Sequence, residues 1–124
     1  MKKIDVDLIE PSQQQLNSLI KYYQTGQYDD AEKLSVSITE EFPKHPFAWK
    51  VLGAIFKQAG RISESLVVFQ KSVQLDPQDA EAHNNLGVIM NELGKLEEAE
   101  VCYRKVIALK PNYAEAHYDL GVIL

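Results

Sequence analysis

Two histidines and one cysteine are the side chains in this 124-residue chain that could most readily do chemistry. His83 and His117 lie 34 residues apart, but no acidic or cysteine partner accompanies them. Because a structural metal site needs about four ligands, we expect half-buried packing histidines instead. Cys102 falls on an apolar stripe, where a thiol stays protonated and unreactive. We find no phosphate-binding glycine loop and no nucleophile–base set, so the sequence predicts no enzyme, no metal site and no cofactor.

Asparagines at regular places indicate binding rather than catalysis. Asn84, Asn85 and Asn91 fall within one short stretch. Each amide carries both a donor and an acceptor, so it can pair with a peptide backbone whatever the side chains of that peptide are. We therefore ask which elements would carry these amides.

A period of 34 residues organises the chain. Prolines recur at positions 43, 77 and 111, and glycines recur at 26, 60 and 94 and again at 53, 87 and 121. Such a period indicates stacked repeats. It divides the chain into units at 12–45, 46–79 and 80–113, followed by a half-unit at 114–124.

Each unit reads as two antiparallel helices. In the third unit, Asp79 is placed to cap the first helix, and Gly94 supplies the left-handed residue that ends it. Pro111 cannot continue the second helix and ends the unit. Gly87 falls in the middle of the first helix, where glycine costs about 1 kcal/mol relative to alanine. A repeated cost of this kind predicts close contact between helices at Gly53, Gly87 and Gly121.

The pattern resembles the tetratricopeptide repeat family. The stretch "WKVLGAIF", followed by Ser65, Phe69 and Pro77, carries the resemblance, and "HNNLGVIM", with Ala99, Tyr103 and Pro111, repeats it. The first unit departs from the pattern, as a capping repeat does. The resemblance implies an all-α fold, a right-handed solenoid of antiparallel helix pairs with three units and one unpaired helix.

In such arrays the first helices line a concave face that binds proteins or peptides. On that face we predict these contact residues: Lys50, Val51, Ala54, Lys57, Asn84, Asn85, Val88, Asn91, Tyr118 and Asp119. Arrays of the O-linked N-acetylglucosamine transferase type use an asparagine ladder, but the matching slot here holds Asn17, Val51, Asn85 and Asp119, so the ladder is interrupted.

A second resemblance concerns family members that clamp the C-terminal carboxylates of chaperone tails. Lys50 and Asn85 match the clamp, but Ala54 replaces one asparagine, and Glu115 and Asp119 replace its two cations. These acids would repel the carboxylates of such a ligand. The sequence favours a partner with lysine or arginine near Asp119.

Composition excludes other classes of partner. The net charge of −5 argues against nucleic acid and anionic membranes. No apolar run approaches the roughly 18 residues that a spanning helix needs. With a single cysteine, the chain suits a reducing compartment, and we predict a cytoplasmic location.

Three readings of the function follow. The first is an interaction module, as a fragment of a longer repeat protein. The second rests on resemblance to bacterial arrays that precede glycosyltransferase, sulfotransferase or methyltransferase domains, and makes the chain a recruiting arm. The third is a self-assembling scaffold, because an unpaired last helix would leave an apolar edge for a second copy. That edge would contain Leu120, Val122, Ile123 and Leu124.

Residues 1–11 lie outside the period. Ile4, Val6 and Leu8 alternate with polar residues, which fits either a short extended segment on the first helix or a frayed terminus. We predict an N-terminal extension here.

Overall fold

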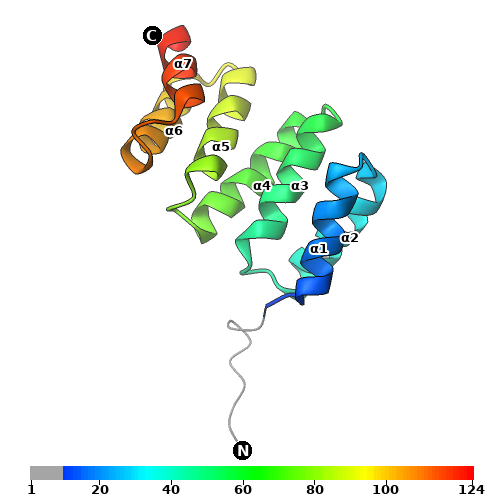
Figure 1. The fold of residues 1–124 in the computed structure, drawn as a ribbon. Helices are drawn as coiled ribbons and strands as arrows, with labels where there is room; N and C mark the ends of the chain where they lie inside the picture. The colour runs from blue at the N-terminus through cyan, green and yellow to red at the C-terminus, as the bar shows by residue number, and fades with distance from the viewer. Residues whose placement is uncertain (1–9) are drawn as a thin grey trace, which may run out of the picture.

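Seven α-helices stack side by side in a computed structural model, which describes residues 10–124 (Figure 1). Their bounds are α1 Gln13–Gln24, α2 Tyr28–Glu41, α3 Pro46–Gln58, α4 Ile62–Leu75, α5 Ala80–Glu92, α6 Leu96–Leu109 and α7 Ala114–Ile123. Each helix packs against the next one along the chain. The predicted all-α solenoid of helix pairs is confirmed, whereas the predicted N-terminal extension falls mainly on residues 1–9, outside the described residues.

Local sequence signals fix the helix ends. Gly26, Gly60 and Gly94 have φ values of 74°, 74° and 75°, the left-handed conformation that follows a helix C-terminus. At the start of α5, the Asp79 carboxylate accepts a hydrogen bond from the backbone N–H of Ala82 at 3.2 Å, as the capping prediction required.

The mid-helix glycines of α3 and α5 each pack directly against an aromatic ring of the following helix. A Cβ on Gly53 would lie 2.6 Å from the ring of Phe69, and a Cβ on Gly87 would lie 2.7 Å from the ring of Tyr103. The predicted close approach is thus confirmed at both positions. A Cβ on Gly121 would meet nothing within 4 Å, so the same prediction is wrong there.

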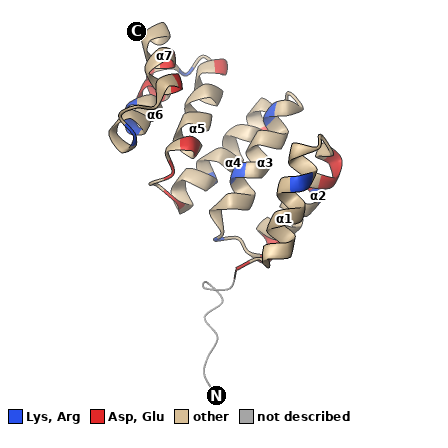
Figure 2. Ribbon diagram, viewed as in Figure 1, with Lys and Arg blue, Asp and Glu red and all other residues tan. Residues whose placement is uncertain are grey.

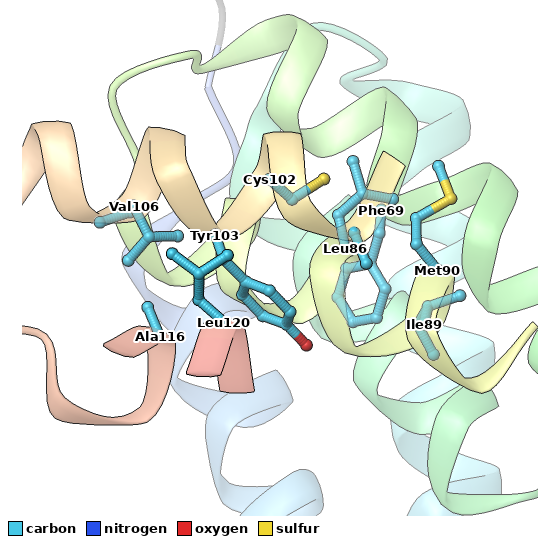
Figure 3. Packing of buried hydrophobic residues seen from close by; sticks show 11 residues of the cluster. Phe69, Leu86, Ile89, Met90, Cys102, Tyr103, Val106, Ala116 and Leu120 are labelled. Atoms are coloured by element: carbon cyan, nitrogen blue, oxygen red, sulfur yellow. The ribbon is translucent and has the colours of Figure 1, made fainter. Parts of the chain in front are cut away.

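A buried cluster joins α4, α5, α6 and α7 (Figure 3). Leu120 belongs to it and is 8% exposed, because it faces α6 and packs near Tyr103. Our placement of Leu120 on an exposed edge is therefore wrong. Ile123 is partly buried against the same cluster, whereas Val122 and Leu124 are 65% and 75% exposed. Self-association through these two residues stays a prediction.

Trp49, His83 and His117 occupy the same position of the repeat. Each contacts the turn that precedes its helix through a ring nitrogen. The Trp49 indole N–H donates to the Pro43 carbonyl at 2.9 Å. The His83 and His117 Nε2 atoms lie 2.8 and 2.6 Å from the carbonyls of the prolines six residues earlier. These distances fit ring N–H donors, so both histidines have structural partners.

The buried ring of Tyr103 carries a hydroxyl with no hydrogen-bond partner among the described residues. Burial, with the negative charge of Asp119 nearby, raises the pKa of Tyr103 to about 12. Burial and Glu98 raise the pKa of the Cys102 thiol to about 11, so the thiol is protonated at neutral pH.

Tyr103→Phe is expected to raise the free energy of unfolding by about 1 kcal/mol, because it removes an unpaired buried hydroxyl. Phe69 fills the equivalent slot one repeat earlier, so the ring itself fits. A raised pKa stabilises the neutral form in the native state, so wild-type stability falls as the pH rises above about 10. Tyr103→Phe has no phenol to ionise, so its free energy of unfolding should fall less between about pH 10 and 12 than that of the wild type. Urea unfolding at pH 7 and at pH 9 to 12 measures both effects, and a destabilised variant at pH 7 would contradict the argument.

Candidate functional site

Two adjoining cavities form one groove across α1, α3 and α5. The larger has a volume of about 480 Å³ and is lined by Ile20, Tyr23, Gln24, Phe47, Lys50, Val51, Ala54, Glu81 and Asn85. The smaller has a volume of about 330 Å³ and is lined by Tyr23, Ala54, Lys57, Gln58, Phe69 and Asn85. Three residues, Tyr23, Ala54 and Asn85, belong to both cavities, so we treat them as one concave groove.

The groove wall is apolar because of helical spacing. Phe47, Val51 and Ala54 lie four and three residues apart, so they share one face of α3. Tyr23 and Ile20, three residues apart on α1, line the opposite wall.

The Asn85 amide lines both cavities of the groove and has no partner among the described residues. Its side chain is half-buried and makes no hydrogen bond to any other described residue. Lys57, which lines the smaller cavity, likewise forms no ion pair with a described residue. The groove therefore combines an apolar wall with an amide and an ammonium group that are available to a ligand.

Lys50 lines the groove, but its charge is already engaged. Its Nζ lies 2.9 Å from Asp79 Oδ2 and 3.7 Å from Glu81 Oε1, and its side chain is 18% exposed. Burial by itself would raise the pKa of Asp79, but hydrogen bonds from Lys50 and the backbone of α5 outweigh it, and the pKa falls below its usual value. Lys50 thus ties α3 to the start of α5.

The structure corrects one predicted contact residue. Asn84 is 3% exposed, and its Nδ2 donates to Glu115 Oε2 at 3.3 Å. It is buried because its face of α5 is turned toward α7, so Asn84 offers no free surface for a partner. Its neighbour Asn85, one residue further round the helix, faces the groove instead.

Of the other predicted contact residues, five line the groove: Lys50, Val51, Ala54, Lys57 and Asn85. The remaining four lie on α5 and α7, outside these two cavities: Val88, Asn91, Tyr118 and Asp119.

The predicted contact residues do not include those that α1 contributes to the groove: Ile20, Tyr23 and Gln24. A signal was present, because Tyr23 lies 34 residues before Lys57 and so occupies the same slot of the repeat.

The ribbon of α7 is coloured for acidic residues in Figure 2, and this helix contains no lysine or arginine. None of the helices among residues 10–124 is both long enough and apolar enough to cross a bilayer.

Comparisons with known proteins agree with this geometry. A family model described as "TPR repeat" matches residues 53–93 and 89–124. No curated protein sequence matches the chain at a significant level. The first TPR of Spaghetti (RPAP3), solved bound to the HSP90 peptide SRMEEVD, is 25% identical with a TM-score of 0.85, and the match covers 94% of each chain.

Two further structures show the same fold at lower identity. The Yersinia enterocolitica type III secretion chaperone SycD, in complex with a peptide of the translocator YopD, is 19% identical with a TM-score of 0.83, and the match covers 89% of each chain. The Thermobaculum terrenum O-GlcNAc transferase is 24% identical with a TM-score of 0.80, over 89% of this chain but 21% of the transferase.

The family model covers the chain from Gly53, within α3, through α7, and the solved structures reproduce the stack of helix pairs over most of the chain. This chain belongs to the tetratricopeptide repeat family.

Proposed function

We propose that the chain is a protein-interaction module that holds an extended peptide in the groove of α1, α3 and α5. The observation that carries this proposal is the Asn85 amide, which has no partner among the described residues and lines both cavities of a groove with apolar and polar walls. An amide in such a place can donate to a peptide carbonyl and accept from a peptide N–H.

Apolar contacts would supply most of the affinity. Side chains that alternate along an extended peptide would enter the spaces beside Tyr23, Val51 and Ala54. Spaghetti and SycD, which share this fold, were each solved with a bound peptide. Their complexes support the same class of ligand for this chain.

The acidic peptide of the Spaghetti complex is not the ligand that this groove favours. The carboxylates of an acidic C-terminus would need several cations. Lys50 is engaged by Asp79, which leaves Lys57 in the described groove, and Glu115 and Asp119 replace two cations of the clamp that the sequence resembles. Like charges across an interface cost several kcal/mol. We propose a partner peptide without an acidic C-terminus.

Asn85→Ala is expected to weaken binding about fivefold, because one or two hydrogen bonds to the peptide backbone are lost. The ligand for this test comes from a phage-displayed library of random heptapeptides, selected on the full chain. Fluorescence anisotropy of a selected peptide, resynthesised with a label, measures the affinity.

Gln70→Ala is the matched control, because it removes an exposed amide from α4, away from the groove. It should leave the affinity unchanged, and both variants should keep the thermal stability of the wild type. If no peptide is selected, or if both variants bind as tightly as the wild type, the proposed groove is wrong.

A further inference from the structure

Lys57 brings a half-buried positive charge into the groove without a counter-charge from the described part of the chain. It lies seven residues after Lys50, two turns further along the same face of α3. The Lys50 ammonium group is held by Asp79 at 2.9 Å, whereas that of Lys57 makes no ion pair and no hydrogen bond with any residue between 10 and 124. A half-buried cation has lost part of its hydration, so it gains from a ligand that supplies an acceptor.

The smaller cavity surrounds this ammonium group with further donors. Its lining includes the side chains of Tyr23, Gln58 and Asn85 together with Lys57. A phenol and two amides can each donate a hydrogen bond, and none of the three does so to another described residue. No Asp or Glu belongs to the described residues that line this cavity. A carboxylate accepts from every one of these donors and carries the charge opposite to that of Lys57.

The larger cavity has a different chemistry. Ile20, Phe47 and Val51 line it, and its two charged groups, on Lys50 and Glu81, lie 3.7 Å from each other. Its charges are therefore already matched within the chain, and its apolar side chains are what it offers to a ligand. The two cavities adjoin, so one extended peptide would meet an apolar site first and a cationic site next to it.

The two helices that supply most of the groove are cationic, although the chain as a whole is acidic. Together α1 and α3 contain Lys21, Lys50 and Lys57 and no Asp or Glu, whereas the net charge of the chain is −5. On α5, Glu81 lies beside Lys50, and Glu92 lines neither cavity. A negative group in the smaller cavity would thus meet a cation without an acid of the cavity lining beside it, and such complementarity gives specificity.

We propose that Lys57 binds an aspartate or glutamate side chain within the partner peptide and so determines the specificity of the groove. The carboxylate enters the smaller cavity while an apolar side chain of the same peptide occupies the larger one. With one charge, Lys57 suits a single side-chain carboxylate and not the several carboxylates of an acidic C-terminus. This proposal rests on the proposed function, and it describes the peptide as one with an apolar and an acidic side chain in a fixed order.

The first test applies the same heptapeptide library to the wild type and to Lys57→Gln. The displayed peptides are joined to the coat protein at their C-termini, so any carboxylate that is selected is a side chain. Wild-type selections are expected to be enriched in Asp or Glu at one fixed place relative to their apolar residues. Lys57→Gln should lose this enrichment and bind a wild-type-selected peptide about fivefold more weakly.

Lys71→Gln is the matched control. Lys71 is also half-buried and forms no ion pair with a described residue, but it lies on α4 and lines neither cavity. Its substitution removes the same charge and should change neither the enrichment nor the affinity. Equal effects of the two substitutions would mean that the overall charge of the chain, and not a contact with Lys57, selects the acid.

A double-mutant cycle identifies the pair directly. A selected peptide is synthesised with a C-terminal amide, once with its acidic residue and once with the corresponding Asn or Gln. The amide peptide should bind the wild type about fivefold more weakly than the acidic peptide, and Lys57→Gln should bind both peptides equally. Circular dichroism checks that each variant is folded. If Lys57→Gln does not fold, equal binding of the two peptides by the wild type still overturns the proposal.

The outcomes separate the two proposals. If peptides bind and Asn85→Ala weakens them, but no acidic residue is enriched, the role of Lys57 is wrong and the groove stands. The role of Lys57 is also wrong if Lys57→Gln selects the same acidic residue as the wild type. If no peptide is selected at all, both proposals fall together.

Discussion

Gly53→Ala is expected to lower the free energy of unfolding by about 3 kcal/mol, the largest stability loss that we predict for a single methyl group in this chain. The new Cβ would lie 2.6 Å from Phe69 Cε1, closer than real Cβ contacts allow. Phe69 is 1% exposed and has no room to retreat. Either the ring leaves its rotamer or α3 and α4 move apart.

A second contact makes separation of the helices costly. The Ser65 hydroxyl on α4 donates to the Gly53 carbonyl at 2.8 Å and is fully buried. Moving α4 away would break this bond and leave a buried hydroxyl unpaired, which is costly in itself. We therefore expect the melting temperature to fall by roughly 10 °C.

The repeat supplies a matched control for this prediction. Gly121→Ala changes the same slot of the last unit, where a Cβ meets nothing within 4 Å. Alanine is the better helix former, so this variant should be as stable as the wild type or slightly more stable. Urea unfolding of both variants measures the difference. Equal destabilisation at both positions would show that contact with Phe69 does not set the cost at Gly53.

The period predicted the backbone well because its signals are local. A glycine after a helix readily adopts the left-handed conformation that ends it, and a proline after the next helix fixes its own φ and lacks an N–H donor. Helix ends near Gly60 and Pro77 therefore follow from residue type alone. The pairing of glycine with an aromatic ring one helix later also follows, because both recur every 34 residues. These features depend on no distant part of the chain.

Side-chain partners were harder to predict because they depend on the neighbouring repeat. Asn84 and Asn85 are identical residues about 100° apart on one helix, and only the position of α7 makes the first buried and the second available. The sequence predicts half-buried packing rings at His83 and His117. In the structure, these histidines share with Trp49 a ring nitrogen within hydrogen-bond distance of a proline carbonyl.

Asp79→Ala is expected to lower the free energy of unfolding by about 2 kcal/mol, because one carboxylate serves two contacts. It caps α5 through the N–H of Ala82 at 3.2 Å, and it holds the ammonium group of Lys50 at 2.9 Å. After the change, only Glu81, at 3.7 Å, remains near that largely buried ammonium.

Asp79→Asn separates the two contributions, because an asparagine still caps a helix but carries no charge. It should cost about half as much as Asp79→Ala at pH 7. If the two substitutions cost the same, the cap contributes nothing, and Lys50 carries the whole effect.

The pH dependence of the stability loss in Asp79→Ala shows whether the ionised Asp79 carboxylate is responsible for that loss. The native pKa of Asp79 lies below the ordinary value of about 4, so the stabilisation is fully present above pH 4 and is lost as the pH falls through the native pKa. The stability difference between wild type and variant should therefore be constant from pH 5 to 7 and shrink in more acidic solution. Urea unfolding from pH 2.5 to 7 measures this difference. A difference that stays the same at every pH would mean that the ionised carboxylate has no part in joining α3 to α5, because a neutral cap would then explain all of it.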